Sequence, residues 1–201
     1  MRRIVIACTL IALATGCAST AARMPGTRVD EKIRDELPLE GRRWAYEAEN
    51  EIIIALDRRD DAAERLADAR AKVEEAEAAE DTASRSGKAK EPAKALVAWR
   101  EAQRRHAEAK VDEAEVAVYC ARTSFELTKA RLAVRFGFPV KEGFVKGFES
   151  QHESCAKEMA DAAAATRDAE VKAAKALEGW RESRREYVNR TGDHDHGLWI
   201  D

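Results

Sequence analysis

Alanine and larger apolar side chains recur at steps of three and four residues through most of this chain. Between Ala45 and Ala83, twelve positions at this spacing include only two polar residues, Arg59 and Glu80. Such a period places the apolar positions on one face of an α-helix, as in a coiled coil. The pattern therefore predicts long amphipathic helices that pack side by side.

Composition supports this fold class. Ala, Glu, Lys, Leu and Arg make up 111 of the 201 residues, whereas aromatic residues make up only 6%. Strand formers and turn residues are too few for a β-sandwich or barrel, and patterned apolar residues are too many for a disordered chain. We expect an all-α protein: an elongated antiparallel three-helix bundle, or coiled coil, with alanine-rich seams.

Breaks in the pattern divide the bundle into three helices, which are expected at residues 39–81, 92–136 and 140–190. The polar run 81–88 ends the first helix, Pro92 suits the first turn of the second, and Gly137 and Pro139 end it. The second helix carries two seams two residues apart, or about 200° around the helix, so it is expected to lie between the other two. Two long helices that dimerise between chains are the alternative.

Alanine buries little apolar area, so stability is expected to depend on helix length and on a few large side chains. A histidine that stands alone in a seam is expected to be packed or partly exposed, as with His106 and His152, and is not expected to bind a ligand. The large residues expected in the core are Trp44, Ile52, Leu66, Val111, Phe125, Leu132, Met159 and Trp180.

The first sixteen residues have the form of a secretory signal, with a basic start followed by twelve apolar residues. Leu13-Ala14-Thr15-Gly16-Cys17 resembles the lipobox of bacterial lipoproteins, in which the cysteine becomes the lipidated N-terminus. The resemblance covers residues 1–18, and it implies that acyl chains on Cys17 anchor the protein to a membrane. By the family's sorting rule, Ala18 implies an outer-membrane lipoprotein that faces the periplasm or the cell surface. An ordinary secretory signal with an incidental cysteine is the alternative.

Outside the bundle, residues 17–38 show no sustained period and are expected to form the lipidated N-terminus and a tether, with a short helix near 30–37. Residues 191–201 form a C-terminal tail, whose Trp199 is expected to dock on the bundle or on a partner. Without residues 1–16 the chain has 33 basic and 38 acidic side chains, with the signs interspersed. This surface offers no basic stripe, so nucleic acid is not expected as a partner.

Two cysteines remain in the bundle, Cys120 and Cys155. A turn at residues 137–139 makes the second and third helices antiparallel, so positions equally far from the turn lie side by side along the bundle axis. Cys120 and Cys155 are about equally far from this turn. Each also lies on the seam assigned to the contact between the second and third helices. In an oxidising compartment this placement predicts a disulfide, and two buried free thiols are the alternative.

The run Asp193-His194-Asp195-His196 is the one metal-like cluster in the sequence. His194 and His196 lie in a tail without further ligands held nearby, so a solvated tail is expected there and no metal site. The sequence offers no nucleophile and base at a meaningful spacing and no phosphate-binding glycine loop. We therefore expect no enzyme, no cofactor and no small-molecule substrate.

These features favour a non-enzymatic envelope lipoprotein whose helical bundle acts as a spacer or protein-interaction scaffold. Its expected partners are the membrane, through the lipid anchor, and either another protein or a second copy. The alternative is an accessory component of an envelope transport or efflux assembly, since residues 119–137 are faintly similar to the α-helical hairpins of periplasmic adaptors and efflux ducts.

Overall fold

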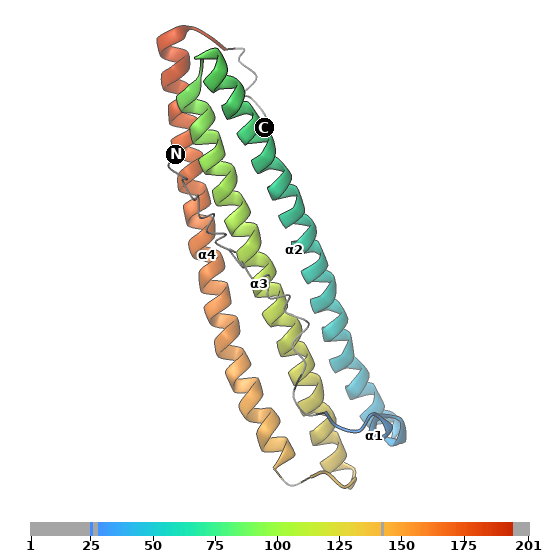
Figure 1. Cartoon of the computed structure of the whole chain (residues 1–201). Coiled ribbons are helices and arrows are strands. Elements are labelled where there is room, and N and C mark those ends of the chain that lie inside the picture. Colours follow the sequence, from blue (N-terminus) through green and yellow to red (C-terminus); the bar gives the residue numbers. More distant parts are fainter. Residues whose placement is uncertain (1–24, 26–27, 142, 195–201) are drawn as a thin grey trace, which may run out of the picture.

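The computed structural model describes residues 25, 28–141 and 143–194. A short helix, α1 (Glu31–Glu36), precedes three long ones, α2 (Leu39–Ser86), α3 (Lys90–Arg135) and α4 (Phe144–Thr191). The long helices contain 46 to 48 residues, so each is about 70 Å long. They lie side by side in an up-down-up arrangement with α3 in the middle (Figure 1). The predicted antiparallel three-helix bundle is therefore confirmed, and no strand occurs in the described part of the chain.

The bundle is a layer with α3 between its two neighbours. α3 packs against both α2 and α4, whereas no described Cα atom of α2 lies within 8 Å of one of α4. The buried positions of α4 are spaced mostly by seven residues, and those of α2 follow the predicted seam. Gly41, one turn before the seam, is buried as well. The other buried positions are Ala45, Ala55, Ala62, Val73, Ala76 and Ala83 on α2 and Phe148, Cys155, Thr166, Ala173, Trp180 and Tyr187 on α4.

The helix ends differ from the expected boundaries by up to five residues. α2 continues to Ser86 because its polar side chains there face solvent while Ala83 extends the buried seam. Gly87, in the left-handed conformation at φ 72°, ends it. α4 begins at Phe144, four residues later than expected, after Gly143 at φ 82°. Pro92 lies in the first turn of α3, as predicted.

We call the end of the bundle that carries the connection between α2 and α3 the turn end. Its core contains a stacked pair, Trp99 and Trp180, whose ring centroids are 4.8 Å apart, together with the buried Leu96 and Tyr187. Trp44, by contrast, was expected in the core but is 53% exposed. It lies one position away from the seam residue Ala45, which is fully buried and takes the contact instead.

The opposite end, where α1 lies beside the start of α2 and the end of α3, is called the α1 end. The short helix expected near residues 30–37 is present as α1. The expected free tether is wrong for this part of the chain, because residues on both sides of α1 pack on the bundle. Val29 joins a cluster with Leu127 and Phe148, and Leu37 joins another with Leu132. Asp30 caps α1 by accepting a hydrogen bond from the backbone N–H of Lys32 at 3.0 Å.

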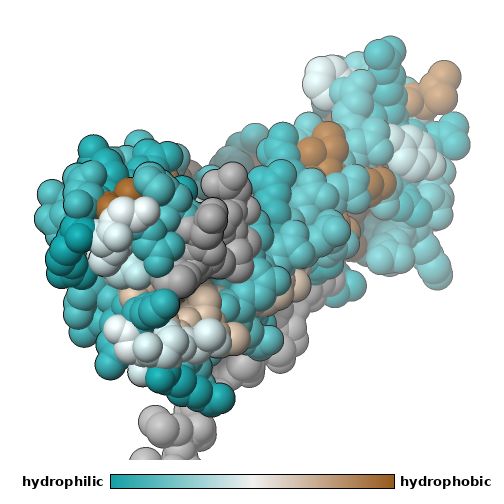
Figure 2. All heavy atoms as spheres, turned by 90° about the horizontal axis from the view of Figure 1, so that it is seen from above, coloured by the Kyte–Doolittle hydropathy of each residue, from teal (hydrophilic) through white to brown (hydrophobic). Residues whose placement is uncertain are grey.

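The surface seen from the turn end is mostly hydrophilic (Figure 2). None of the described helices combines the length and the apolar character that a membrane span requires.

Candidate functional site

A buried ion pair at the α1 end holds the chain that precedes α1. Glu126 and Lys129 lie one turn apart on α3, and Lys129 Nζ is 2.8 Å from Glu126 Oε1. Glu126 Oε2 accepts a hydrogen bond from the backbone N–H of Val29 at 2.8 Å, and Lys129 Nζ donates one to the carbonyl oxygen of Val29 at 3.5 Å. We call these two side chains and the peptide groups of Val29 the clasp.

The clasp depends on burial. The side chains of Lys129 and Glu126 are only 4% and 8% exposed. Charges taken out of water are tolerated when they are paired and when hydrogen bonds satisfy their remaining polar atoms. The backbone of Val29 supplies such bonds to both members of the pair. When this segment docks, its peptide groups therefore replace water as hydrogen-bond partners of the buried charges. A second link, Arg34 to Glu49 at 3.3 Å, joins α1 to α2.

A polar cavity of about 350 Å³ lies beside the clasp. Arg28 and Arg34 line it from the docked segment, and Arg122 and the clasp line it from α3. Burial lowers the pKa of Arg122, and the charges of Arg59 and Arg28 lower it further. Several guanidinium groups are therefore crowded around the point where the N-terminal segment meets the bundle.

The structure brings Cys120 and Cys155 together in a disulfide between α3 and α4, with their Cα atoms 5.6 Å apart. Cys155 is 1% exposed. Cys120 precedes Glu126 by six residues, which is about 9 Å along the helix axis. The disulfide thus fastens α4 to α3 close to the segment of α3 that holds the clasp.

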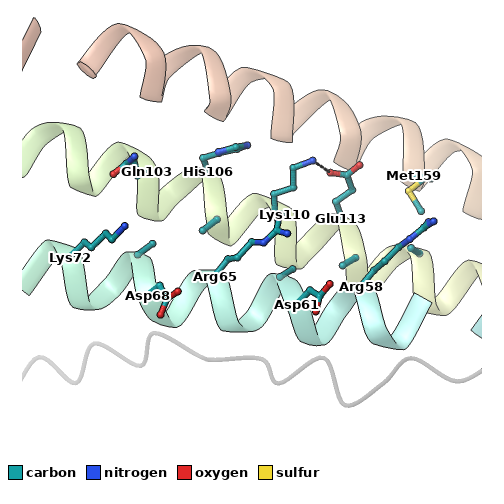
Figure 3. Close-up of a pocket in the computed structure, with 15 residues that line it drawn as sticks. Arg58, Asp61, Arg65, Asp68, Lys72, Gln103, His106, Lys110, Glu113 and Met159 are labelled. Carbon is teal, nitrogen blue, oxygen red and sulfur yellow. Dashed lines mark hydrogen bonds and ion pairs between the residues drawn. The ribbon is translucent and has the colours of Figure 1, made fainter. Parts of the chain in front are cut away.

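A groove of about 680 Å³ runs along one face of α3, where α2 and α4 do not meet. Figure 3 shows Arg65 extending from α2 toward α3 and Arg58 extending toward Met159 of α4. Charges of opposite sign alternate along the α2 side of this groove, in the order Arg58, Asp61, Arg65, Asp68 and Lys72. A groove with this mixed charge suits a polypeptide segment of mixed charge better than a single small anion.

The floor of the groove is formed by α3. There Lys110 Nζ lies 3.3 Å from Glu113 Oε2. The Nε2 atom of His106 is buried and has no hydrogen-bond partner among the described residues. On another face of α3, burial raises the pKa of Asp112, and the nearby carboxylates of Glu115 and Glu108 raise it further.

The remaining sites expected from the sequence are placed as follows. Cys17, His196 and Trp199 lie outside the described residues. His194 is exposed beyond the end of α4, and His152 is exposed on α4. Within the described ranges, no three His, Cys, Asp or Glu side chains are grouped so that they could hold a metal ion.

No protein-family model, curated protein sequence or solved structure matches this chain. Function is therefore inferred from the residues and their arrangement.

Proposed function

We propose that this protein is a non-enzymatic bacterial envelope lipoprotein, anchored through lipidated Cys17, whose bundle acts as a spacer or protein-interaction scaffold. The observation that carries the proposal is the clasp. It ties the segment that follows Cys17 to one end of a bundle about 70 Å long.

The covalent chain limits how far the anchor can lie from the bundle. Cys17 precedes Pro25 by eight residues, and an extended chain spans at most about 3.6 Å per residue, so Cys17 lies within about 29 Å of Pro25. Pro25 lines the cavity beside the clasp. A membrane-inserted Cys17 therefore holds the α1 end near the bilayer. The turn end then lies up to about 70 Å farther from the bilayer, where it can contact a partner.

Lipidation of Cys17 is tested by intact mass measurement of the protein purified from membranes. We expect a mature chain that begins at Cys17 and carries the added mass of its acyl chains. Cys17→Ser should remove that mass and release the protein from the membrane fraction. The matched control, Cys8→Ser, lies within the expected signal peptide and should leave lipidation unchanged. A membrane-associated chain without acyl mass contradicts the proposal.

The scaffold role is tested by photo-crosslinking in whole cells. A crosslinker at the exposed position Ser84, near the turn end, is compared with one at the exposed Lys146, near the α1 end. Capture of peptidoglycan, of a second copy or of another envelope protein specifically from Ser84 supports a spacer or scaffold. Capture of transporter subunits instead supports the accessory role in envelope transport or efflux.

A further inference from the structure

The polar cavity beside the clasp is lined by three separate parts of the fold. Arg28 and Arg34 line it from the docked segment, Glu49 lines it from α2, and Arg122 and Lys129 line it from α3. Its volume is about 350 Å³. Because the docked segment supplies part of the lining, a ligand in this cavity contacts both that segment and the bundle.

Positive charges outnumber negative charges in the described lining, which has four cationic side chains and three carboxylates. Two of the carboxylates have cationic partners. Glu126 Oε1 lies 2.8 Å from Lys129 Nζ. Glu49 Oε1 lies 3.3 Å from Arg34 Nη1. The third carboxylate, Glu31, is exposed in the first turn of α1. The lining therefore has one positive charge in excess.

The two remaining cations of the lining, Arg28 and Arg122, belong to different elements that meet at the cavity. Burial lowers the pKa of Arg122, and the charges of Arg59 and Arg28 lower it further. Arg28 thus acts electrostatically on Arg122, and an anion between them relieves this repulsion.

A phosphate group suits two guanidinium groups that approach from different elements. Guanidinium forks bind phosphate oxygens through paired, charge-assisted hydrogen bonds. The oxygens of a phosphate are arranged as a tetrahedron, so it can accept such bonds from both elements at once, whereas a carboxylate has two oxygens in one plane. A phosphate group with a single negative charge also matches the single excess charge of the lining.

We infer that this cavity binds a singly charged phosphate group between Arg28 and Arg122. The source is either inorganic phosphate or the headgroup of a phospholipid, and the proposed anchor at Cys17 brings the second source close to the α1 end. The site itself does not depend on lipidation. A phosphate bound to both elements holds the segment against α3, so the ligand should keep the clasp closed.

The test is amide hydrogen exchange of a peptide that contains Val29, measured on the full-length protein in detergent micelles without phosphate. The N–H of Val29 is bonded to Glu126, so it exchanges when the segment undocks. A ligand that binds only the docked form reduces undocking by a factor of one plus the ratio of ligand concentration to Kd. At ten times Kd, exchange should therefore be about 11-fold slower.

The two sources are compared in separate titrations. One uses inorganic phosphate, with sodium chloride of the same ionic strength as its control. The other adds phosphatidylglycerol to the micelles, with a galactolipid that has no phosphate as its control. Slower exchange with inorganic phosphate supports the site with a soluble ligand, and slower exchange with phosphatidylglycerol alone supports it with a lipid headgroup. The first titration is repeated on Cys17→Ser, so its result does not depend on the proposed function.

Variants of opposite charge should change the affinity in opposite directions. Arg28→Gln, at an exposed position, and Arg122→Gln should each weaken binding roughly ten- to hundredfold. Glu31→Gln removes a negative charge from the lining and should strengthen binding. The matched control, Glu64→Gln, lies at an exposed position of α2 twelve residues beyond Ile52 of the lining and should leave binding unchanged.

The inference is overturned if neither phosphate source slows exchange at Val29. It is also overturned if sodium chloride slows exchange as much as phosphate does, because the effect is then general screening of charge. Retention of the full effect in Arg28→Gln, which changes an exposed side chain, shows that the anion binds elsewhere and has the same consequence.

Discussion

Removal of one member of the clasp should release the N-terminal segment from the bundle. Glu126→Gln leaves the ammonium group of Lys129 buried without its carboxylate, and Lys129→Met leaves the carboxylate without its cation. Loss of one partner from a buried ion pair costs about 3 to 5 kcal/mol. Release of residues 28–38 lets water reach the remaining charge, so we expect this cost to appear mainly as local opening.

The assay is amide hydrogen exchange of a peptide that contains Val29. A cost of 3 to 5 kcal/mol corresponds to exchange that is faster by roughly 10² to 10⁴. The double variant Glu126→Gln with Lys129→Met removes both charges together. Its exchange rate at Val29 should therefore be much closer to that of the wild type than the rate of either single variant.

A matched control is the pair Glu178 and Arg181, which has the same spacing of three residues and a distance of 2.7 Å but is more than half exposed. Glu178→Gln should change stability by less than about 1 kcal/mol. The reasoning is refuted if Glu126→Gln alters exchange at Val29 no more than Glu178→Gln does.

Three further perturbations test other parts of the fold. Reduction of the disulfide between Cys120 and Cys155 opens a loop of 35 residues and should lower the free energy of unfolding by about 3 to 4 kcal/mol in urea titrations; alkylation of both cysteines in unreduced protein would contradict the bond. The pKa of Asp112 is raised in the folded chain, so its ionised form opposes folding. Asp112→Asn should therefore increase the free energy of unfolding at pH 7. This increase should disappear as the pH falls toward 3.8, where the unfolded chain also holds the proton. Trp180→Ala should cost about 3 to 5 kcal/mol in thermal or urea unfolding, whereas Trp44→Ala, at a half-exposed position, should cost less than about 1 kcal/mol.

The long helices could be predicted from the sequence because their packing repeats. Each seam repeats over several heptads, with a buried position mostly every seven residues on α4, so a single error, such as the assignment of Trp44 to the core, leaves the period intact. Cys120 and Cys155 could be related to each other for the same reason, since an antiparallel hairpin fixes the relative height of residues on either side of its turn.

The clasp could not be predicted, because it depends on contacts across about 100 positions of the sequence. In the sequence, Glu126 and Lys129 resemble the many solvated charges of these helices, but in the structure they are buried and bonded to the backbone of Val29. Val29 and Leu37 carry no period that would mark them as core residues, because a segment with a six-residue helix is too short to repeat. Burial of this kind follows from tertiary docking and leaves little local signal.

The two seams of α3 explain why the bundle is a layer. A helix in a triangular bundle meets both neighbours on one broad apolar stripe, whereas seams about 200° apart place the neighbours on opposite sides. The faces of α3 between the seams then stay partly open, with Lys110 on one face and Asp112 on another. In the middle of the layer many contacts are made by small residues such as Ala62, which bury little area. The strongest interactions between helices therefore lie toward the ends of the bundle. They are the stacked tryptophans at the turn end, and the disulfide and the clasp toward the α1 end.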